Sequence, residues 1–270
     1  MRIRSNAVVG GLLVGILFTV ALVSLLWTPY DPLALNLKLR LHAPVASHWL
    51  GTDEFGRDVL SRVMAGAGTS LLVAALTVAL AVTCGTFLGL VAGFFRGMTD
   101  RILMVFNDAL LAFPGILLAL GVMVIVGANK FGIVVALGIA YTPSTVRLVR
   151  AAVLSLREKE YIEASRVIGN SELYTLWRHV LPNCAAPLLV LATSMFGWVI
   201  LAESALSFLG LGVPPPAPTW GNMLSAGRPY IESAAWIGIA PGLCISLSLL
   251  GINLLGDAVS DWLDPRMERH

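Results

Sequence analysis

Six long runs of apolar residues constrain this chain more than any other feature of its sequence. They lie at residues 7–27, 69–95, 102–127, 131–149, 184–211 and 233–258, and each is free or nearly free of charge. A helix needs about 20 mainly apolar residues to cross a bilayer, because the hydrocarbon core is about 30 Å thick and a helix rises about 1.5 Å per residue. The runs therefore predict an all-α, polytopic membrane protein with six transmembrane helices.

The composition agrees with this class and argues against several others. Hydrophobic residues make up 57% of the chain and charged residues only 13%, about half the charged fraction of a soluble domain. The net charge is +2 and no basic run is present, so no nucleic-acid partner is expected. The three cysteines lie far apart inside apolar runs and the four histidines form no metal-binding pair. Neither a metal nor another cofactor is expected.

Positive charges predict the orientation of the chain in the membrane. With the N-terminus inside, the inner segments hold twelve lysines and arginines and the outer segments hold six. This excess predicts that both termini are cytoplasmic, in the inner membrane of the cell. The first apolar run follows Arg2 and Arg4, as in a signal peptide, but it is longer than the apolar h-region of a signal peptide and no small-residue cleavage site precedes Trp27. We expect a retained transmembrane helix.

Two connecting segments are unusually long. Residues 28–68 form a predicted outer segment, and residues 150–183 form a predicted cytoplasmic loop. We divide the chain into an N-terminal region, 1–65, and a transmembrane domain, 66–270. The first contains one helix and most of the outer segment, and the second contains five helices and the loop.

The loop has the spacing of two short amphipathic helices. Two sets of residues repeat at i, i+3, i+4 and i+7: Tyr161, Ala164, Ser165 and Ile168, and then Leu173, Leu176, Trp177 and Val180. Gly169 supplies a left-handed residue that ends the first helix, and Pro182 is expected to end the second. Spacing alone favours helices whose apolar faces lie on the protein's own helix ends or on the lipid surface.

The same segment resembles the EAA loop of ABC-importer membrane subunits, whose pattern is E-A-A, three residues, G, nine residues and I-x-L-P. The matching positions are Glu163, Ala164, Ser165, Gly169, Leu181 and Pro182. Ser165 replaces the second alanine and His179 replaces the isoleucine. The R-H-x-L-P-N ending is a variant found in the peptide and nickel branch of these permeases.

The resemblance implies that the loop docks as a coupling helix into a groove of a cytoplasmic ATPase subunit. Small residues at 164, 165 and 169 would permit close backbone approach, and Glu163 would pair with a basic group of that partner. The resemblance further implies a heterodimer with a second, homologous permease subunit. Two ATPase subunits and an extracytoplasmic substrate-binding protein would complete the assembly.

Three further stretches resemble the same branch. Residues 51–58, G-T-D-E-F-G-R-D, resemble the N-terminal region of C-type subunits of dipeptide, oligopeptide and nickel importers. By chemistry alone they form a polar turn before the second helix. Residues 202–221 resemble the E-x-x-L-S-F-L-G-L-G…P…W-G signature, and residues 253–266 resemble the N-L-x-G-D-x-L-R-D-x-L-D-P-R ending. Ser260 stands where the family usually has arginine.

Three acidic residues fall within predicted spans: Asp108, Glu203 and Asp257. A charge at the bilayer centre costs about 2.5–3.5 kcal/mol on insertion scales, so each is expected to face protein or water. Glu203 or Asp108 could line a translocation path. Asp108 and Asp257 lie near the ends of their runs, where capping of helices or pairing with neighbouring helices is the favoured interpretation. For Glu203, both a place on the translocation path and a pairing role remain possible interpretations.

Other classes of function are weakly supported. No G-x-x-x-x-G-K-[S/T] loop is present and no lysine follows a glycine, so ATP hydrolysis is expected on another polypeptide. Asp108 and Asp257 could be imagined as the acidic pair of an intramembrane enzyme, but no G-x-G-D or G-x-S-x-G motif accompanies them. A channel or secondary transporter predicts polar residues in the middle of its spans and broken helices within a repeat. We therefore expect a permease without catalytic residues.

The resemblance favours di- or oligopeptides as the transported substrate. Nickel, or another small solute such as glutathione, is the alternative. No cluster of His, Cys or Met suits a metal path, which favours peptides.

Overall fold

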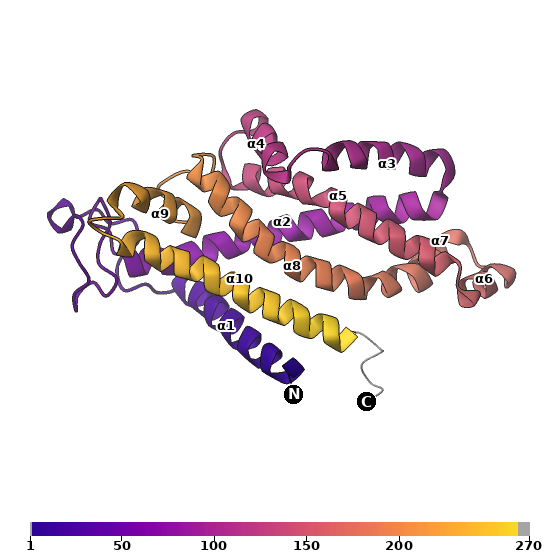
Figure 1. The fold of residues 1–270 in the computed structure, drawn as a ribbon, viewed down its shortest axis with the longest axis horizontal. Coiled ribbons are helices and arrows are strands. Elements are labelled where there is room, and N and C mark those ends of the chain that lie inside the picture. The colour runs from indigo at the N-terminus through magenta and orange to yellow at the C-terminus, as the bar shows by residue number, and fades with distance from the viewer. Residues whose placement is uncertain (1, 264–270) are drawn as a thin grey trace.

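In the computed structural model, the backbone is described for residues 2–263 and the side chains for residues 5–263. Long helices lie side by side along the long axis, with α9 and the segment 25–58 at one end and α6 and α7 at the other (Figure 1). We call these the α9 end and the α6 end. The elements are α1 Arg2–Ser24, η1 Leu37–Leu39, α2 Val59–Phe95, α3 Gly97–Leu111, α4 Gly115–Val126, α5 Lys130–Arg157, α6 Glu160–Val167, α7 Glu172–Thr175, η2 Leu176–Val180, α8 Leu181–Phe208, α9 Trp220–Gly227, η3 Arg228–Tyr230 and α10 Trp236–Leu263.

The expected all-helical membrane fold is confirmed. Among the described residues, five helices are long and apolar enough to cross a membrane: Ser5–Ser24, Val59–Phe95, Lys130–Arg157, Glu172–Phe208 and Trp236–Leu263. The helix α2 runs without interruption through residues 65 and 66, so the division of the chain there stays a prediction.

The third expected span, 102–127, differs from a straight helix. It consists of α3 and α4, which meet at an angle of 95°. Pro114 precedes α4 and cannot donate a backbone N–H, and its ring disfavours the helical conformation of Phe113. The helix therefore breaks at this point, and the fold has six crossings if the bent pair counts as one.

Two helices distant in sequence, α2 and α5, touch along a face of glycines. Gly85, Gly89 and Gly93 recur every fourth residue on α2 and lie against Thr145, Val149 and Val153 of α5. A Cβ at position 89 would lie 2.7 Å from Cβ of Val149, and one at position 93 would lie 2.8 Å from Cβ of Val153. Such spacing of small residues lets helix backbones approach closely where water provides no driving force.

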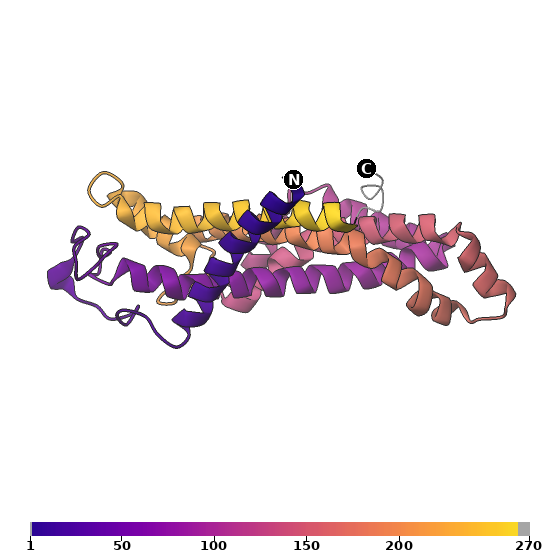
Figure 2. The same cartoon turned by 90° about the horizontal axis from the view of Figure 1, so that it is seen from below.

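The first helix, α1, lies at the periphery and packs on α10. A Cβ at Gly10 would lie 2.9 Å from the carbonyl oxygen of Gly251, and one at Gly251 would lie 3.0 Å from Cβ of Leu13. Figure 2 shows α1 crossing the bundle obliquely. In Figure 1, α1 begins and α10 ends on the side that faces the α6 end, so these two helix termini share a side.

The glycine contact generates a prediction for stability. Gly89→Leu should lower the free energy of unfolding by about 1–3 kcal/mol, because the added atoms collide with Val149 and with the backbone of α5. Thermal unfolding of the purified protein in detergent measures the change. Gly121→Leu is the control, since no heavy atom lies within 4 Å of a Cβ there. Equal melting temperatures for both variants would contradict the proposed packing constraint.

Candidate functional site

The loop between α5 and α8 turns sharply at a glycine. The helix α6 ends at Val167 with Ile168 as its C-cap, and Gly169 follows with φ of +89°, in the left-handed region that favours glycine. The hydroxyl of Ser171 then accepts a hydrogen bond from the backbone N–H of Tyr174 at 3.2 Å and caps α7. The predicted glycine turn between two helical segments is confirmed.

The prediction that Pro182 ends the second helix of the loop is wrong. Helical structure continues from Glu172 to Phe208, and Pro182 lies in the first turn of α8, where it is exposed. A π-helical turn, Leu176–Val180, precedes it, and the N–H of Leu181 bonds to the carbonyl of Leu176. This wider turn changes the hydrogen-bond register just before the proline, whose missing N–H then leaves the helix intact.

The inner side of the loop is packed against the transmembrane helices. Ile162, Leu176 and Val180 are buried in one cluster with residues of α2 and α5, including Phe94 and Val153. This arrangement corrects the expected apolar face of α6, because Tyr161 and Ile168 are exposed whereas Ile162 is buried. The loop is therefore joined to the bundle by a hydrophobic contact.

A small polar network fixes the two arms of the loop to each other. The hydroxyls of Ser165 and Thr175 lie 3.0 Å apart, and the side-chain amide of Asn170 donates to Ser165 at 3.1 Å. Ser165 and Thr175 are both buried. Serine at the second alanine position of the motif thus supplies a hydrogen bond between the two arms of the loop that alanine could not.

The outer side of the loop exposes an apolar tip, which we define as Val167, Ile168, Leu173 and Trp177. Their exposed fractions are 82%, 79%, 61% and 64%. Arg166 and Glu172 form an ion pair of 3.3 Å beside the tip. Of the motif residues, Glu163, Ala164, Gly169 and Pro182 are exposed, Leu181 is half-buried and Ser165 is buried. An exposed apolar patch of this kind is a candidate contact surface for another protein or for the surface of the lipid bilayer.

The G-T-D-E-F-G-R-D stretch forms a second structured site, at the α9 end. Asp53 is buried and its carboxylate accepts hydrogen bonds from the backbone N–H of Arg57 at 2.9 Å and from its guanidinium at 2.6 Å. The guanidinium of Arg62, on α2, lies 3.4 Å from the same carboxylate and donates to the carbonyl of Pro32 at 3.1 Å. Burial raises the pKa of the neighbouring Glu54 carboxyl, and the charge of Asp53 raises it further.

The second aspartate of the stretch links the segment 25–58 to α2. Asp58 caps α2 by accepting from the backbone N–H and the hydroxyl of Ser61, at 2.8 and 2.7 Å, and its other oxygen lies 2.9 Å from Nδ1 of His48. The indole N–H of Trp236 donates to the carbonyl of Thr52 at 3.1 Å, which ties the stretch to α10. The motif is therefore a compact, charge-paired structure that holds the outer segment, a role that its sequence alone did not reveal.

Trp220 and Gly221, at the end of the signature 202–221, anchor α9. Trp220 is fully buried, its backbone N–H donates to Ser70 at 3.1 Å and its indole N–H donates to the carbonyl of Val63 at 3.1 Å. A Cβ at Gly221 would lie 2.6 Å from Cα of Ser204, so only glycine fits where α9 meets α8. The signature therefore fastens α9 between α2 and α8.

Glu203 lies beneath this anchor. It is 1% exposed, it accepts a hydrogen bond from Ser207 at 2.8 Å, and a Cβ at Gly221 would be 3.1 Å from its second oxygen. The carboxylate thus faces the N-terminus of α9, where the helix dipole favours negative charge. In this conformation it faces protein, and its role in a translocation path stays a prediction.

Asp108, the other candidate for the path, is exposed on α3 and forms an ion pair of 2.8 Å with Arg147 of α5. About two turns earlier on the same helix, Asp100 receives two hydrogen bonds from Arg150, at 2.6 and 2.7 Å. These two pairs hold α3 on α5. The pairing of Asp108 between helices agrees with the interpretation that the sequence favoured. Asp257, on α10, was expected to pair in the same way but is exposed.

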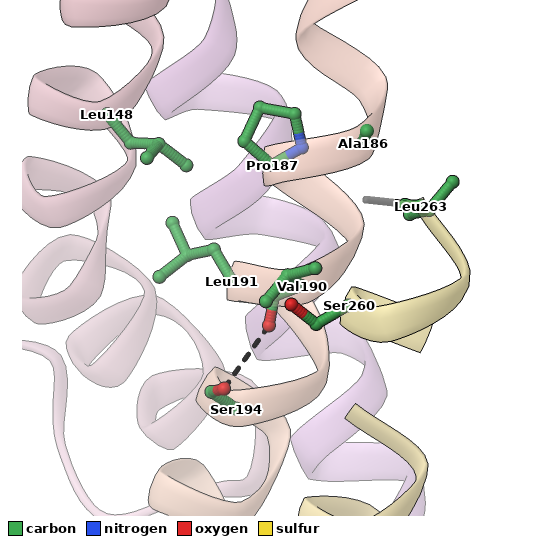
Figure 3. A pocket seen from close by; sticks show the side chains of 8 residues that line it. All are labelled: Leu148, Ala186, Pro187, Val190, Leu191, Ser194, Ser260 and Leu263. Atoms are coloured by element: carbon green, nitrogen blue, oxygen red, sulfur yellow. Dashed lines mark hydrogen bonds between the residues drawn. The ribbon is translucent and has the colours of Figure 1, made fainter. Parts of the chain in front are cut away.

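An apolar hollow of about 480 Å³ lies between α5, α8 and α10 (Figure 3). Leu148, Pro187 and Leu191 contribute to its walls, together with the hydroxyl-bearing Ser194 and Ser260. Ser194 donates its hydroxyl hydrogen to the carbonyl of Val190, one turn earlier, at 3.2 Å. Neither Glu203 nor Asp108 is among the residues around this hollow.

Sequence comparison places these sites among known transporters. Residues 85–269 match the family described as "Binding-protein-dependent transport system inner membrane component". The chain is 42% identical over 262 residues to a dipeptide transport system permease protein of Alkalihalophilus pseudofirmus, covering 97% of this chain and 86% of the relative. It is 41% identical over 263 residues to a glutathione transport system permease protein of Pectobacterium atrosepticum, covering 97% and 87%.

The fold has counterparts among solved structures. An inward-facing structure of the MetNI methionine ABC transporter superposes with a TM-score of 0.62 at 18% identity, covering 75% of this chain and 96% of the other. At this level of identity the likeness concerns the fold alone.

The buried charges at the α9 end generate a prediction. Asp53→Ala should destabilise the segment 25–58 by about 3–5 kcal/mol, because it leaves two buried arginines without their shared carboxylate. Limited trypsin digestion after Lys38 and Arg40 measures this, with faster cleavage expected. Glu232→Ala, at an exposed residue of the same end, is the control. Wild-type protection in the Asp53 variant would show that the cluster does not hold the segment.

Proposed function

The chain belongs to the binding-protein-dependent transport system inner membrane components and is a permease component of an ABC importer, and we propose that it imports short peptides. The names of relatives at 42% and 41% identity support a dipeptide or a tripeptide such as glutathione. Both substrates are small peptides with a free carboxylate, so one pathway chemistry suits either. Residues 51–58 and 202–221 resemble a branch that dipeptide, oligopeptide and nickel importers share, so the choice of peptides depends on the names of the relatives.

The apolar tip of the loop carries the proposal for energy coupling. The tip is exposed, whereas the inner side of the same loop is packed on α2 and α5. We infer that an ATPase subunit covers the tip, so that a rigid-body movement of that subunit displaces α5 and α8 directly. Glu163 and Ala164 are exposed beside the tip and available for contact, and Gly169 shapes the turn between its two halves.

The proposed assembly contains four other subunits and a fixed orientation. A second, homologous permease subunit pairs with this chain, two ATPase subunits bind from the cytoplasm, and a substrate-binding protein delivers peptide at the α9 end. Basic residues support a cytoplasmic α6 end in the inner membrane, since Arg157, Lys159, Arg166 and Arg178 lie in or beside the loop. Both termini are then cytoplasmic.

A substitution at the turn tests the coupling proposal. Gly169→Pro should abolish recovery of the ATPase with the tagged permease and should abolish peptide uptake, because proline cannot adopt a φ of +89°. Membrane insertion should be unchanged. Gly169→Asn is the matched control, since asparagine tolerates the left-handed region. Normal ATPase recovery and uptake with proline at this position would refute the role of the turn.

Site-directed labelling tests the orientation. In a variant without the three native cysteines, Ser171→Cys should react with a membrane-impermeant maleimide only after cells are permeabilised. Ser233→Cys, an exposed position at the α9 end, should react in intact cells. Reaction of position 171 from outside would reverse the proposed topology and with it the site of ATPase docking.

A further inference from the structure

A hollow at the α9 end lies between the end of α8, α9 and the start of α10. Its volume is about 330 Å³ and its walls are apolar, formed by Phe208, Leu224, Ile231 and Ile239 together with small residues of α9 and α10. This volume is at the lower end of the range of about 300–1,000 Å³ that small-molecule pockets occupy. The hollow therefore has room for a small apolar group.

One charged side chain stands at this hollow. Arg228 follows directly after α9, and its guanidinium carbon lies 5.0 Å from the centroid of the Phe208 ring. The ring supports the flat guanidinium by a cation–π contact, which limits the orientations available to the charge. Within the described part of the chain, no carboxylate lies within ion-pair distance of Arg228, in contrast to Arg57, Arg147 and Arg150.

We propose that Arg228 and this hollow bind the C-terminal residue of an incoming peptide, the guanidinium holding the carboxylate and the hollow holding an apolar side chain. This inference rests on the proposed function, because it takes the α9 end as the side of entry. Arginine presents two parallel N–H donors to a carboxylate, a geometry that fixes the position of the peptide end as well as attracting its charge. The site then specifies a free C-terminus.

The two parts of the site match the two parts of one ligand. A free carboxylate alone would need only the exposed arginine, and an apolar group alone would need only the hollow. Their junction at Phe208, which both lines the hollow and stacks beneath the guanidinium, suits a carboxylate and a side chain attached to the same carbon. The site therefore fits a C-terminal amino acid residue.

Photolabelling of the complete transporter in nanodiscs tests this site. The probe is alanyl-photoleucine, a dipeptide with a small diazirine side chain, and the comparison probe is its C-terminal amide. We expect the free acid to label the region 224–239, and Arg228→Ala to reduce that labelling about tenfold or more, as loss of a charged hydrogen bond implies. The amide should label weakly in either protein, and Arg228→Lys should give an intermediate yield. Arg40→Ala, at an exposed arginine of the same end, should label like the unmodified transporter.

Three results would overturn the inference. Equal labelling by acid and amide, or labelling that Arg228→Ala leaves unchanged, would exclude carboxylate recognition by this residue. Labelling by the acid that is lost in nanodiscs containing phosphatidylglycerol, and restored in phosphatidylcholine alone, would assign the site to a lipid phosphate. Recovery of the ATPase with each variant is measured in parallel, so that failure of this site is distinguished from failure of the proposed transporter assembly.

Discussion

The close contact of α2 with α5 is the interaction on which the rest of the structure depends. Three glycines spaced one turn apart remove the side chains that would separate the two backbones. In lipid this matters more than in water, because the solvent is as apolar as the helices and tight packing must hold them together. The two ends of the molecule are attached to this pair of helices. The segment 25–58 leads directly into α2, and the loop with the apolar tip follows α5. The loop and the segment 25–58 are therefore joined through one tightly packed pair of helices.

Polar groups within the described chain are concentrated where they join elements. Asp53 and Asp58 fasten the outer segment to α2, Trp220 fastens α9 to α2, and Asp100 with Arg150 fastens α3 to α5. Each is a charged group or an N–H donor that would be costly to leave unpaired away from water. The family signatures thus describe joints between helices, and the hydrophobic runs between them describe the surfaces that meet lipid and other helices.

Much of this architecture could be predicted from residues alone, and the failures have physical causes. Hydropathy identified every crossing because the length of an apolar run reports directly on bilayer thickness. It could not reveal the bend at Pro114, since two short apolar helices in sequence have the same hydropathy as one long helix. Pro182 was predicted to end a helix, but the helix continues through it, because a π-helical turn changes the hydrogen-bond register just before the proline. Glu203 and the segment 51–58 required the structure, since their partners, such as Gly221 and Trp236, lie far away in sequence.

The uninterrupted course of the chain from Glu172 to Phe208 has a mechanical consequence. A helix of 37 residues is about 55 Å long at a rise of about 1.5 Å per residue. It carries Trp177 near one end and Ser204 near the other, and α9 is seated against Ser204. A tilt of this helix at the end that carries Trp177 would therefore also displace the end on which α9 packs. One continuous helical segment thus joins the loop at the α6 end to the helix α9 at the opposite end.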